Sequence, residues 1–218
     1  MSEIKAKYTK GEEIFNMVSH IAGVAVGIVA LVLCVVFSAI KHNPYGVVAS
    51  SIYGASMIIL YSVSSIYHGL SPHIGAKKVM QTIDHCSIFL LIAGTYTPVC
   101  LCSLREYNTA LGWTLFGVIW GISALGITLN AISVKKFKIF SAICYIAMGW
   151  CIVLVWKPTV QMLTFGGILL MLLGGISYTI GALFYYFFKK KKYMHSVFHI
   201  FVVIGSILQM FSVLFYII

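Results

Sequence analysis

Residues 15–40 read FNMVSHIAGVAVGIVALVLCVVFSAI, a run of 26 residues without an Asp, Glu, Lys or Arg. A helix needs about 20 mainly apolar residues to cross the hydrocarbon layer of a membrane, which is about 30 Å thick. This run therefore predicts a membrane-spanning helix, and the rest of the chain repeats the pattern. Seven such stretches are separated by short charged or turn-forming segments: approximately Phe15–Ile40, Val47–His68, Ile83–Ser103, Thr109–Ile132, Ile139–Trp156, Leu163–Phe188 and Val197–Ile218.

The composition of the whole chain agrees with this pattern. Of the 218 residues, 61% are hydrophobic and 9% are charged, and the mean hydropathy is +0.99. A soluble domain carries about 25% charged residues, so a chain this poor in charge could not cover a water-exposed surface. We therefore expect an all-α, polytopic membrane protein in which residues 1–218 form a single domain, a bundle of seven transmembrane helices.

Basic residues alternate sharply between the connections. The positive-inside rule places the connections rich in Lys and Arg in the cytoplasm. It predicts a cytoplasmic N-terminus and, after seven crossings, a C-terminus outside the cell. The twelve residues on the basic side are Lys5, Lys7, Lys10, Lys77, Lys78, Lys135, Lys136, Lys138, Lys189, Lys190, Lys191 and Lys192, against Lys41, Arg105 and Lys157 on the other.

The net charge of +10 therefore reports orientation, and we expect the lysine runs to contact anionic lipid rather than nucleic acid. The polar segment Met1–Glu13 does not resemble a cleavable signal peptide. Together with the short connections, this favours a multi-pass protein of the bacterial inner membrane.

Small residues in the spans indicate close packing between helices. Gly23-x-x-x-Gly27 and Gly117-x-x-x-Gly121 are patterns that mark helix contacts inside a bundle more often than dimer interfaces. All six cysteines fall in or beside spans without a C-x-x-C pair, so we expect packing residues rather than disulfides or metal ligands. Pro98 predicts a kink near the outer end of the third span.

Ionisable residues inside the spans are functional candidates, because charge is costly in lipid. His68 ends the second span, Asp84 begins the third, and His195 and His199 open the seventh. The topology inferred from the lysines places these four residues at one membrane depth, near the cytoplasmic face. His42 and His73 lie beside prolines in connections, where we expect them to be solvated.

The spacing of these residues suits a metal ion. His195 and His199 lie one turn apart on one helical face, an arrangement that chelates divalent ions, and His68 would supply a third nitrogen. Spacing alone also fits two histidines that merely reach the membrane surface. Three histidines with an open fourth position are typical of catalytic zinc, with Asp84 to hold or deprotonate a water and Ser64, one turn before His68, within reach.

A further polar group opens the first span. Glu13, Asn16 and His20 recur at helical spacing on the cytoplasmic side. The sequence leaves their role open, and for His20 we favour a polar network that fastens the first helix to the bundle.

The chain resembles the bacterial hemolysin III branch of the progestin and adipoQ receptor family over nearly its whole length. The matching motifs are Glu13-Ile-Phe-Asn16-Met-Val-Ser-His20, Ser64-Ser-Ile-Tyr-His68, Asp84-His85-Cys-Ser-Ile-Phe-Leu-Leu-Ile-Ala-Gly-Thr-Tyr-Thr-Pro98, Met148-Gly-Trp150 and His195-Ser-Val-Phe-His199. The resemblance implies seven helices and Zn2+ near the cytoplasmic face.

By the same resemblance, the zinc ligands are His68, His195 and His199, and Asp84 and Ser64 are water-holding and supporting groups. The chain departs from the family at Gln209, where bacterial members often have a histidine. Gln209 would lie away from the proposed zinc.

These observations bear on three functions, and the first two fit them better than the third. The first is a zinc hydrolase that cleaves a lipid amide or ester, as the resemblance to ceramidases and adiponectin receptors implies. The second is a non-enzymatic sensor or regulator of lipid state or membrane energetics, in which zinc is structural. The third, a pore-forming hemolysin, fits poorly because the chain offers no soluble form. Membrane lipid is the expected substrate or ligand, and the sequence does not indicate the oligomeric state.

Overall fold

The computed structural model describes residues 8–188 and 191–218, and the predicted cytoplasmic residues Lys5, Lys7, Lys189 and Lys190 lie outside the described part. Within it the secondary structure is helical, without a strand, which confirms the all-α prediction. The helices are α1 (Lys10–Ile40), α2 (Pro44–Gly69), α3 (Ala76–Pro98), the π-helix η1 (Val99–Leu104), α4 (Arg105–Tyr107), α5 (Thr109–Gly149), the 3-10 helix η2 (Cys151–Val155), α6 (Trp156–Met162), α7 (Phe165–Phe188) and α8 (Met194–Tyr216).

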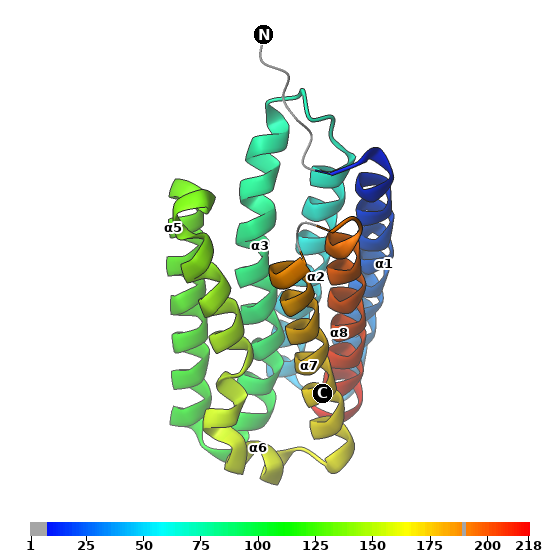
Figure 1. Ribbon diagram of the computed structural model, residues 1–218. Helices are drawn as coiled ribbons and strands as arrows, with labels where there is room; N and C mark the ends of the chain where they lie inside the picture. The colour runs from blue at the N-terminus through cyan, green and yellow to red at the C-terminus, as the bar shows by residue number, and fades with distance from the viewer. Residues whose placement is uncertain (1–7, 189–190) are drawn as a thin grey trace.

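Six helical segments in the described ranges are long and apolar enough to cross a membrane. They are Lys10–Ile40, Pro44–Gly69, Ala76–Tyr107, Thr109–Met162, Phe165–Phe188 and Met194–Tyr216. The fourth contains 54 residues, more than one crossing needs. Within this segment Ser133, inside α5, leaves the helical conformation, with φ −165° and ψ 101°. Figure 1 shows that the chain turns back within α5. The break lies two residues before the predicted connection Lys135–Lys138, which is itself helical.

Polar caps decide where several helices begin. Thr9 forms a capping box at α1: its hydroxyl accepts from the backbone N–H of Glu12, and the Glu12 carboxylate accepts from the backbone N–H of Thr9. Asn43 caps α2, where Oδ1 accepts from the backbone N–H of Gly46 at 2.9 Å. Such signals are independent of hydropathy, so α1 begins five residues before the predicted apolar span.

The third helix differs from its predicted span at both ends. α3 begins at Ala76, seven residues before Ile83. Its first turns are helical but contain polar residues, so they do not belong to the apolar stretch from which the span was predicted. The π-helix η1 follows directly after Pro98, which lacks the N–H that would continue the α-helical pattern. Pro98, where the sequence predicts a kink, thus marks a change of helix type.

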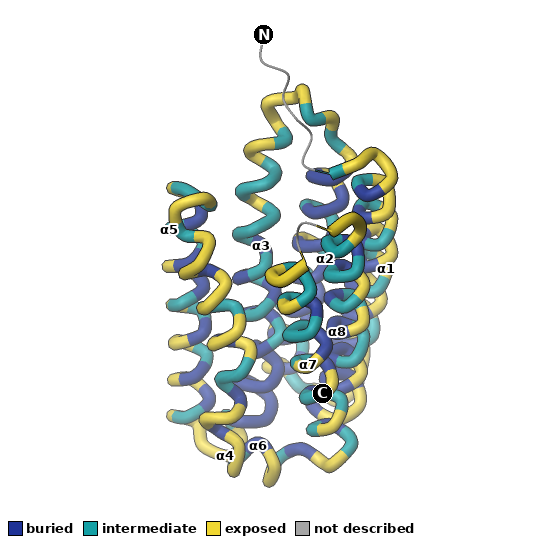
Figure 2. Tube along the Cα trace, viewed as in Figure 1, coloured by how far each residue is buried: buried dark blue, intermediate teal, exposed yellow. Residues whose placement is uncertain are grey.

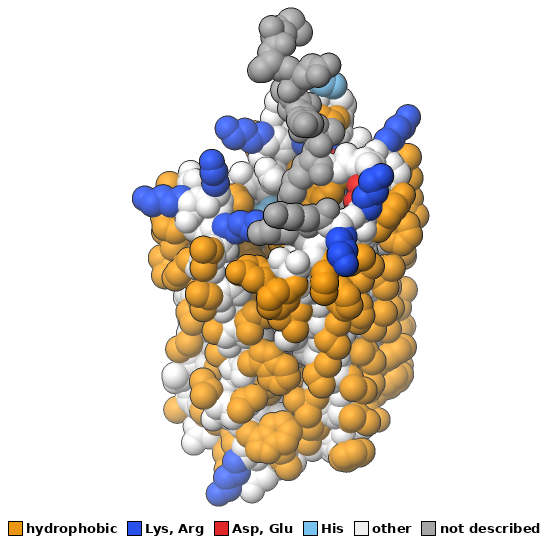
Figure 3. Space-filling model, viewed as in Figure 1, with side chains coloured by type: hydrophobic (Ala, Val, Ile, Leu, Met, Phe, Trp, Pro, Cys, Tyr) orange, Lys and Arg blue, Asp and Glu red, His pale blue; other side chains and the backbone are white. Residues whose placement is uncertain are grey.

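Small and polar residues are buried in the bundle together with an apolar core, and many large apolar side chains face outward. In α1 the buried residues follow a helical stripe: Glu12, Asn16, His20, Gly23, Gly27, Ala30, Cys34 and Ser38. The opposite face of α1 carries exposed Ile, Val and Phe side chains, such as Val18 and Val32. Figure 2 shows the buried positions facing the interior of the bundle, and Figure 3 shows hydrophobic side chains covering its body. This distribution suits a lipid surrounding.

The two glycine patterns have different surroundings. A Cβ on Gly23 would lie 2.4 Å from the Tyr61 ring, and one on Gly27 would lie 3.1 Å from atoms of Ile58, so α1 and α2 approach closely there. A Cβ on Gly117 or Gly121 would meet no atom within 4 Å. The expectation of an internal contact is confirmed for the first pattern and wrong for the second.

The helix termini that carry the candidate residues lie at one end of the bundle. α1 packs on α2 and α8, α3 packs on α2 and α5, and α7 packs on α8. Figure 1 shows the starts of α1, α3 and α8 and the end of α2 at the end of the molecule where the N-terminus lies. Lys and Arg side chains also gather at that end (Figure 3). The six cysteines are free, as predicted.

Candidate metal centre

Three histidines meet at this end of the bundle. His68 comes from the last turn of α2, and His195 and His199 come from the first turns of α8. Nε2 of His195 lies 3.4 Å from Nε2 of His68 and 3.1 Å from Nε2 of His199. One ligand atom from each ring lies within 4.8 Å of the other two, so the three side chains could hold a metal ion.

The donor set fits zinc. Zn–N bonds of about 2.0–2.1 Å in tetrahedral geometry separate two ligand nitrogens by about 3.3 Å, close to the two Nε2 separations here. His68 and His199 are each 2% exposed, so water can hardly satisfy their ring nitrogens. Among the described residues, these three form the one group of His, Cys, Asp or Glu close enough to share an ion.

A carboxylate from α1 holds the first histidine. Oε2 of Glu13 lies 2.5 Å from Nδ1 of His68, and Oε1 of Glu13 accepts from Nζ of Lys77 at 2.7 Å. Lys77 also donates to the carbonyl of Leu70, just beyond α2, at 2.9 Å. The pair from α1 and α2 is therefore tied to the beginning of α3.

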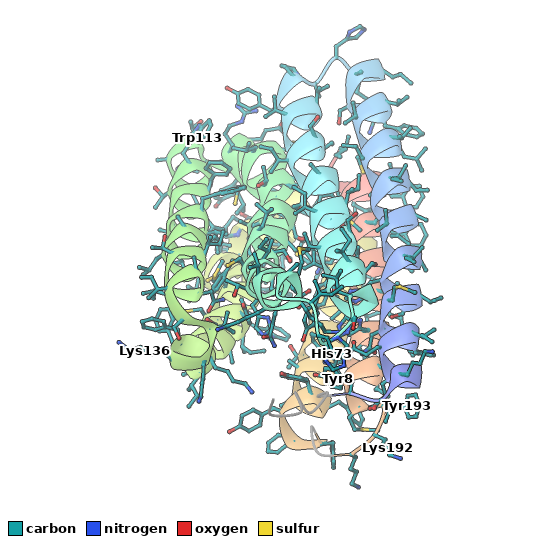
Figure 4. The ribbon with its side chains drawn as sticks, turned by 90° about the horizontal axis from the view of Figure 1, so that it is seen from above. Tyr8, His73, Trp113, Lys136, Lys192 and Tyr193 are labelled. Carbon is teal, nitrogen blue, oxygen red and sulfur yellow. The ribbon has the colours of Figure 1, made fainter. Side chains whose placement is uncertain are left out.

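Aromatic rings flank the other two histidines. His20 stacks on His199 with ring centroids 3.7 Å apart, and it meets the edge of Tyr61 at 5.0 Å. Tyr8 stacks on His195 at 4.9 Å with an interplanar angle of 7°. Burial raises the pKa of the Tyr8 phenol, so this ring is uncharged when it packs on the histidine. Figure 4 looks down on this end and shows Tyr8 on the side of the molecule that carries Tyr193.

Asn16 and Glu12 fasten α1 to the beginning of α8. The hydroxyl of Ser196 donates to Oδ1 of Asn16 at 2.6 Å, and the backbone N–H of Tyr193 donates to Oε1 of Glu12 at 2.7 Å. The bond of Asn16 is a polar connection of the kind that the sequence suggests for the Glu13, Asn16 and His20 group. His20 does not share in it, since neither ring nitrogen has a hydrogen-bond partner among the described residues.

A cavity of about 180 Å3 begins at the histidines. His195, His199, His20, Ser64 and Asp84 contribute to its wall. The remaining lining is largely apolar and comes from α2, α3, α5, α7 and α8, including Leu60, Ile88, Leu91, Ile92, Ile146, Trp150 and Val202. Gln209 lines the same cavity, ten residues beyond His199, which corresponds to about 15 Å along a helix. The cavity therefore has a polar end at the histidines and a largely apolar remainder, the apolar channel.

The two supporting candidates differ in their surroundings. Ser64 is buried, with 2% of its surface exposed. Asp84 is partly buried, and its Oδ2 lies 3.7 Å from Nδ1 of the neighbouring His85. Both share the cavity wall with His195 and His199, so a substrate group beside the histidines would have a hydroxyl and a carboxylate within the same space.

All five candidates from the sequence thus lie in one region, and His42 and His73 are exposed as expected. Sequence reasoning missed the pairing of Glu13 with His68 and the stacking of His20 on His199. The Glu13, Asn16 and His20 pattern signals a polar face on α1, but it does not name the helix that this face meets. Gln209 donates to the carbonyl of Met171 at 2.9 Å, away from the three histidines.

Comparison with known proteins gives a consistent result. The model of the family described as haemolysin-III related matches residues 8–210. The chain is similar to Hemolysin-3 of Bacillus cereus, with 40% identity over 94% of this chain and 92% of that protein. It is also similar to the Hemolysin-3 homolog of Bacillus subtilis (strain 168), with 38% identity over 96% of each chain. A human protein, the monocyte to macrophage differentiation factor, is 25% identical over 84% of this chain and 78% of its own length.

Proposed function

The chain belongs to the haemolysin-III related family, and from this premise we propose that it is a zinc-dependent hydrolase that cleaves an amide or ester bond of a membrane lipid. It is a multi-pass bacterial membrane protein, as its six long apolar helices and its family membership establish. The observation that carries the proposal is the convergence of three Nε2 atoms at the polar end of an apolar cavity.

Three features of this site fit a catalytic zinc ion. The three donors offered are imidazole nitrogens, which suit zinc better than magnesium or calcium. Three protein ligands leave a fourth position for water or substrate, as in catalytic zinc sites. That position would open toward the cavity, because His195 and His199 line it.

The residues around the cavity supply the remaining chemistry. Zinc, when bound, polarises a carbonyl group and makes water more acidic. We assign to Asp84 the removal of a proton from the attacking water, and its later delivery to the leaving amine or alkoxide. Ser64 can donate a hydrogen bond to the oxygen of the scissile carbonyl as negative charge develops there.

The cavity lining supports a lipid substrate. Beyond the histidines, the wall consists mainly of Ile, Leu, Val and aromatic side chains, which would bind an acyl chain and not a hydrated polar molecule. A lipid whose amide or ester lies beside the histidines would place its acyl chain along this channel, and it would enter from the surrounding bilayer.

We also propose seven membrane crossings, with the N-terminus and the histidines on the cytoplasmic side. The break at Ser133 divides the 54-residue segment into two parts. The first part is long enough to span a membrane, and the second is long enough when η2 and α6 are counted with the end of α5. The twelve-to-three distribution of basic residues favours this orientation.

The decisive experiment for the hydrolase is turnover by the purified protein in lipid nanodiscs. We expect zinc-loaded wild-type protein to release fatty acid from at least one member of a panel of ceramides, N-acyl amides and lysolipids. The variant His195→Ala should release none, whereas His73→Ala, in an exposed loop, should match wild type. Absence of release from every lipid, with zinc present, would contradict the hydrolase.

One observation favours a second candidate, a non-enzymatic membrane sensor with structural zinc. The ligands and their partner Glu13 come from α1, α2 and α8, so an ion there would brace three helices. On this alternative, removing zinc with a chelator should lower the melting temperature greatly, and no lipid should be hydrolysed.

A further inference from the structure

We propose that Glu13 is a positioning residue of the metal centre, which holds His68 in the tautomer that turns Nε2 toward the ion, and that Lys77 holds Glu13 in turn. The inference rests on the proposed zinc site and extends it to the helices that do not contribute a ligand. It predicts that zinc affinity depends on a carboxylate in α1 and an ammonium group in α3.

The tautomer follows from the contacts of His68. A neutral imidazole has one N–H donor and one nitrogen with a free lone pair. The carboxylate of Glu13 is 2.5 Å from Nδ1, so the proton belongs on Nδ1, and the lone pair is then on Nε2. Nε2 is the atom that lies 3.4 Å from Nε2 of His195, at the point where the three rings converge. Glu13 therefore prepares the ligand atom that the site uses.

The orientation of the ring depends on the same bond. The His68 side chain is fully buried, and the Glu13 side chain is 14% exposed. A hydrogen bond between a buried imidazole and a carboxylate fixes the rotation of the ring and increases the basicity of the ligand nitrogen. Loss of such a partner commonly weakens metal binding about 10- to 100-fold.

Lys77 completes the arrangement from a third helix. Its ammonium group is 2.7 Å from the other oxygen of Glu13, and the Lys77 side chain is 13% exposed. The lysine compensates the charge of a carboxylate largely removed from water, and it turns that carboxylate so that Oε2 meets His68. Its bond to the carbonyl of Leu70 fixes the segment directly after α2.

Glu12, the neighbour of Glu13, makes different contacts, so a change at Glu13 can affect the metal centre without removing the bonds that hold the start of α1. Glu12 closes the capping box with Thr9 and accepts from the backbone N–H of Tyr193. The beginning of α1 and its attachment to α8 therefore depend on Glu12, and Glu13 can be changed while these bonds remain.

The test measures zinc affinity by competition with a chromophoric chelator, in detergent, for wild type, Glu13→Gln and Lys77→Met. Glu106→Gln serves as the matched control, because Glu106 is an exposed acid that follows η1. We expect Glu13→Gln to bind zinc about 10- to 100-fold more weakly, Lys77→Met to show a smaller loss, and Glu106→Gln to equal wild type. The visible absorption of the Co2+-substituted protein should also change in Glu13→Gln, because the orientation of a ligand changes.

The outcomes separate this inference from the function on which it rests. If wild-type protein binds no zinc, both fail. If wild type binds zinc and Glu13→Gln binds it equally tightly with the same Co2+ spectrum, Glu13 has no positioning role and the zinc site stands. To identify a merely structural effect, the melting temperature of the zinc-free variants is compared. A weaker affinity in Glu13→Gln that is accompanied by a large loss of stability in the zinc-free protein would also overturn the inference, because misfolding would then explain the lost affinity.

Discussion

Each of the three histidines is held by a different kind of neighbour. His68 is held by a carboxylate, His199 by a stacked imidazole, and His195 by a stacked tyrosine ring. Only the first of these neighbours can choose a tautomer, because stacking restrains the plane of a ring without accepting its proton. A carboxylate thus supports His68 through a hydrogen bond, and aromatic rings stack on His199 and His195.

Substitution of a histidine ligand and substitution of Asp84 should have different effects on zinc content. Asp84→Asn removes the proton acceptor and leaves all three histidines in place. We expect hydrolysis to fall by at least about 100-fold, the usual contribution of a general base, while zinc content stays at the wild-type level. Fatty-acid release and elemental analysis on the same preparation check both expectations. Unchanged turnover in Asp84→Asn would remove it from the mechanism.

A second residue-scale prediction concerns the serine on the cavity wall. Ser64→Ala deletes the hydroxyl proposed to stabilise developing charge, and the small change in volume should leave the fold intact. The expected result is slower turnover, by about 10- to 1,000-fold, with unaltered zinc affinity. The neighbouring Ser65→Ala is the matched control, since the Ser65 hydroxyl bonds to the carbonyl of Tyr61 within α2. Equal rates for both variants would contradict the role of Ser64.

The sequence could predict the candidate residues, and it could not predict how they are supported. Scarcity of charge singled out His68, Asp84, His195 and His199, and their places at helix ends put them at one depth. The support from Glu13 and His20 depends on which face of α1 meets which helix, and several packings of seven helices satisfy the same hydropathy pattern. Nothing in the local sequence decides among them.

At the scale of the helices, contact between α1 and α2 depends on the absence of a side chain at Gly23. A Cβ there would lie 2.4 Å from a ring atom of Tyr61, and this ring is fully buried, with its hydroxyl donating to Ser206 at 2.6 Å. The ring therefore has little room to move. We expect Gly23→Ala to destabilise the protein by about 1–3 kcal/mol, the usual cost of overpacking, as a lower melting temperature in detergent.

The chain supplies a control for that experiment. Gly117→Ala introduces the same methyl group into a helix, where a Cβ would meet no atom within 4 Å. Its melting temperature should equal or slightly exceed that of wild type, because alanine favours helix more than glycine does. If both variants melted alike, close packing at Gly23 would not be important.

Helix boundaries show where hydropathy is informative and where it is not. Most residues of each predicted span are helical, because a long apolar helix is required to cross a bilayer. The starts of α1 and α3 lie outside the predicted spans, since Thr9 with Glu12 and the polar turn at Lys77 favour helix without adding hydrophobicity. No glycine or proline lies beside Ser133 to predict the turn there, so the sequence indicates a connection only through the neighbouring lysines.

At the scale of the whole molecule, charge and chemistry share one end. Most of the Lys and Arg side chains in view gather at the end that holds the three candidate ligands and the polar end of the cavity, and hydrophobic side chains cover the rest of the bundle (Figure 3). A hydrolase in this arrangement would act on lipid bonds near the membrane surface on the basic side, while the acyl chain stays in the apolar channel.

The proposed topology predicts the side on which each terminus lies. Fusion of alkaline phosphatase, which is active outside the cytoplasm, to the C-terminus should give high activity, and fusion of β-galactosidase there should give little. Truncation after Ile132 followed by the same reporters should give the opposite pattern, because the chain has then crossed four times. A C-terminal β-galactosidase fusion that is fully active would contradict seven crossings with a cytoplasmic N-terminus.

The metal content of the purified protein shows whether His68, His195 and His199, from two helices, hold a zinc ion. Protein purified without added chelator should contain about one zinc per chain by elemental analysis. The variants His68→Ala, His195→Ala and His199→Ala should each lose most of it, and His73→Ala should keep it. Equal zinc in wild type and in all three ligand variants, or no zinc in any of them, would contradict the account.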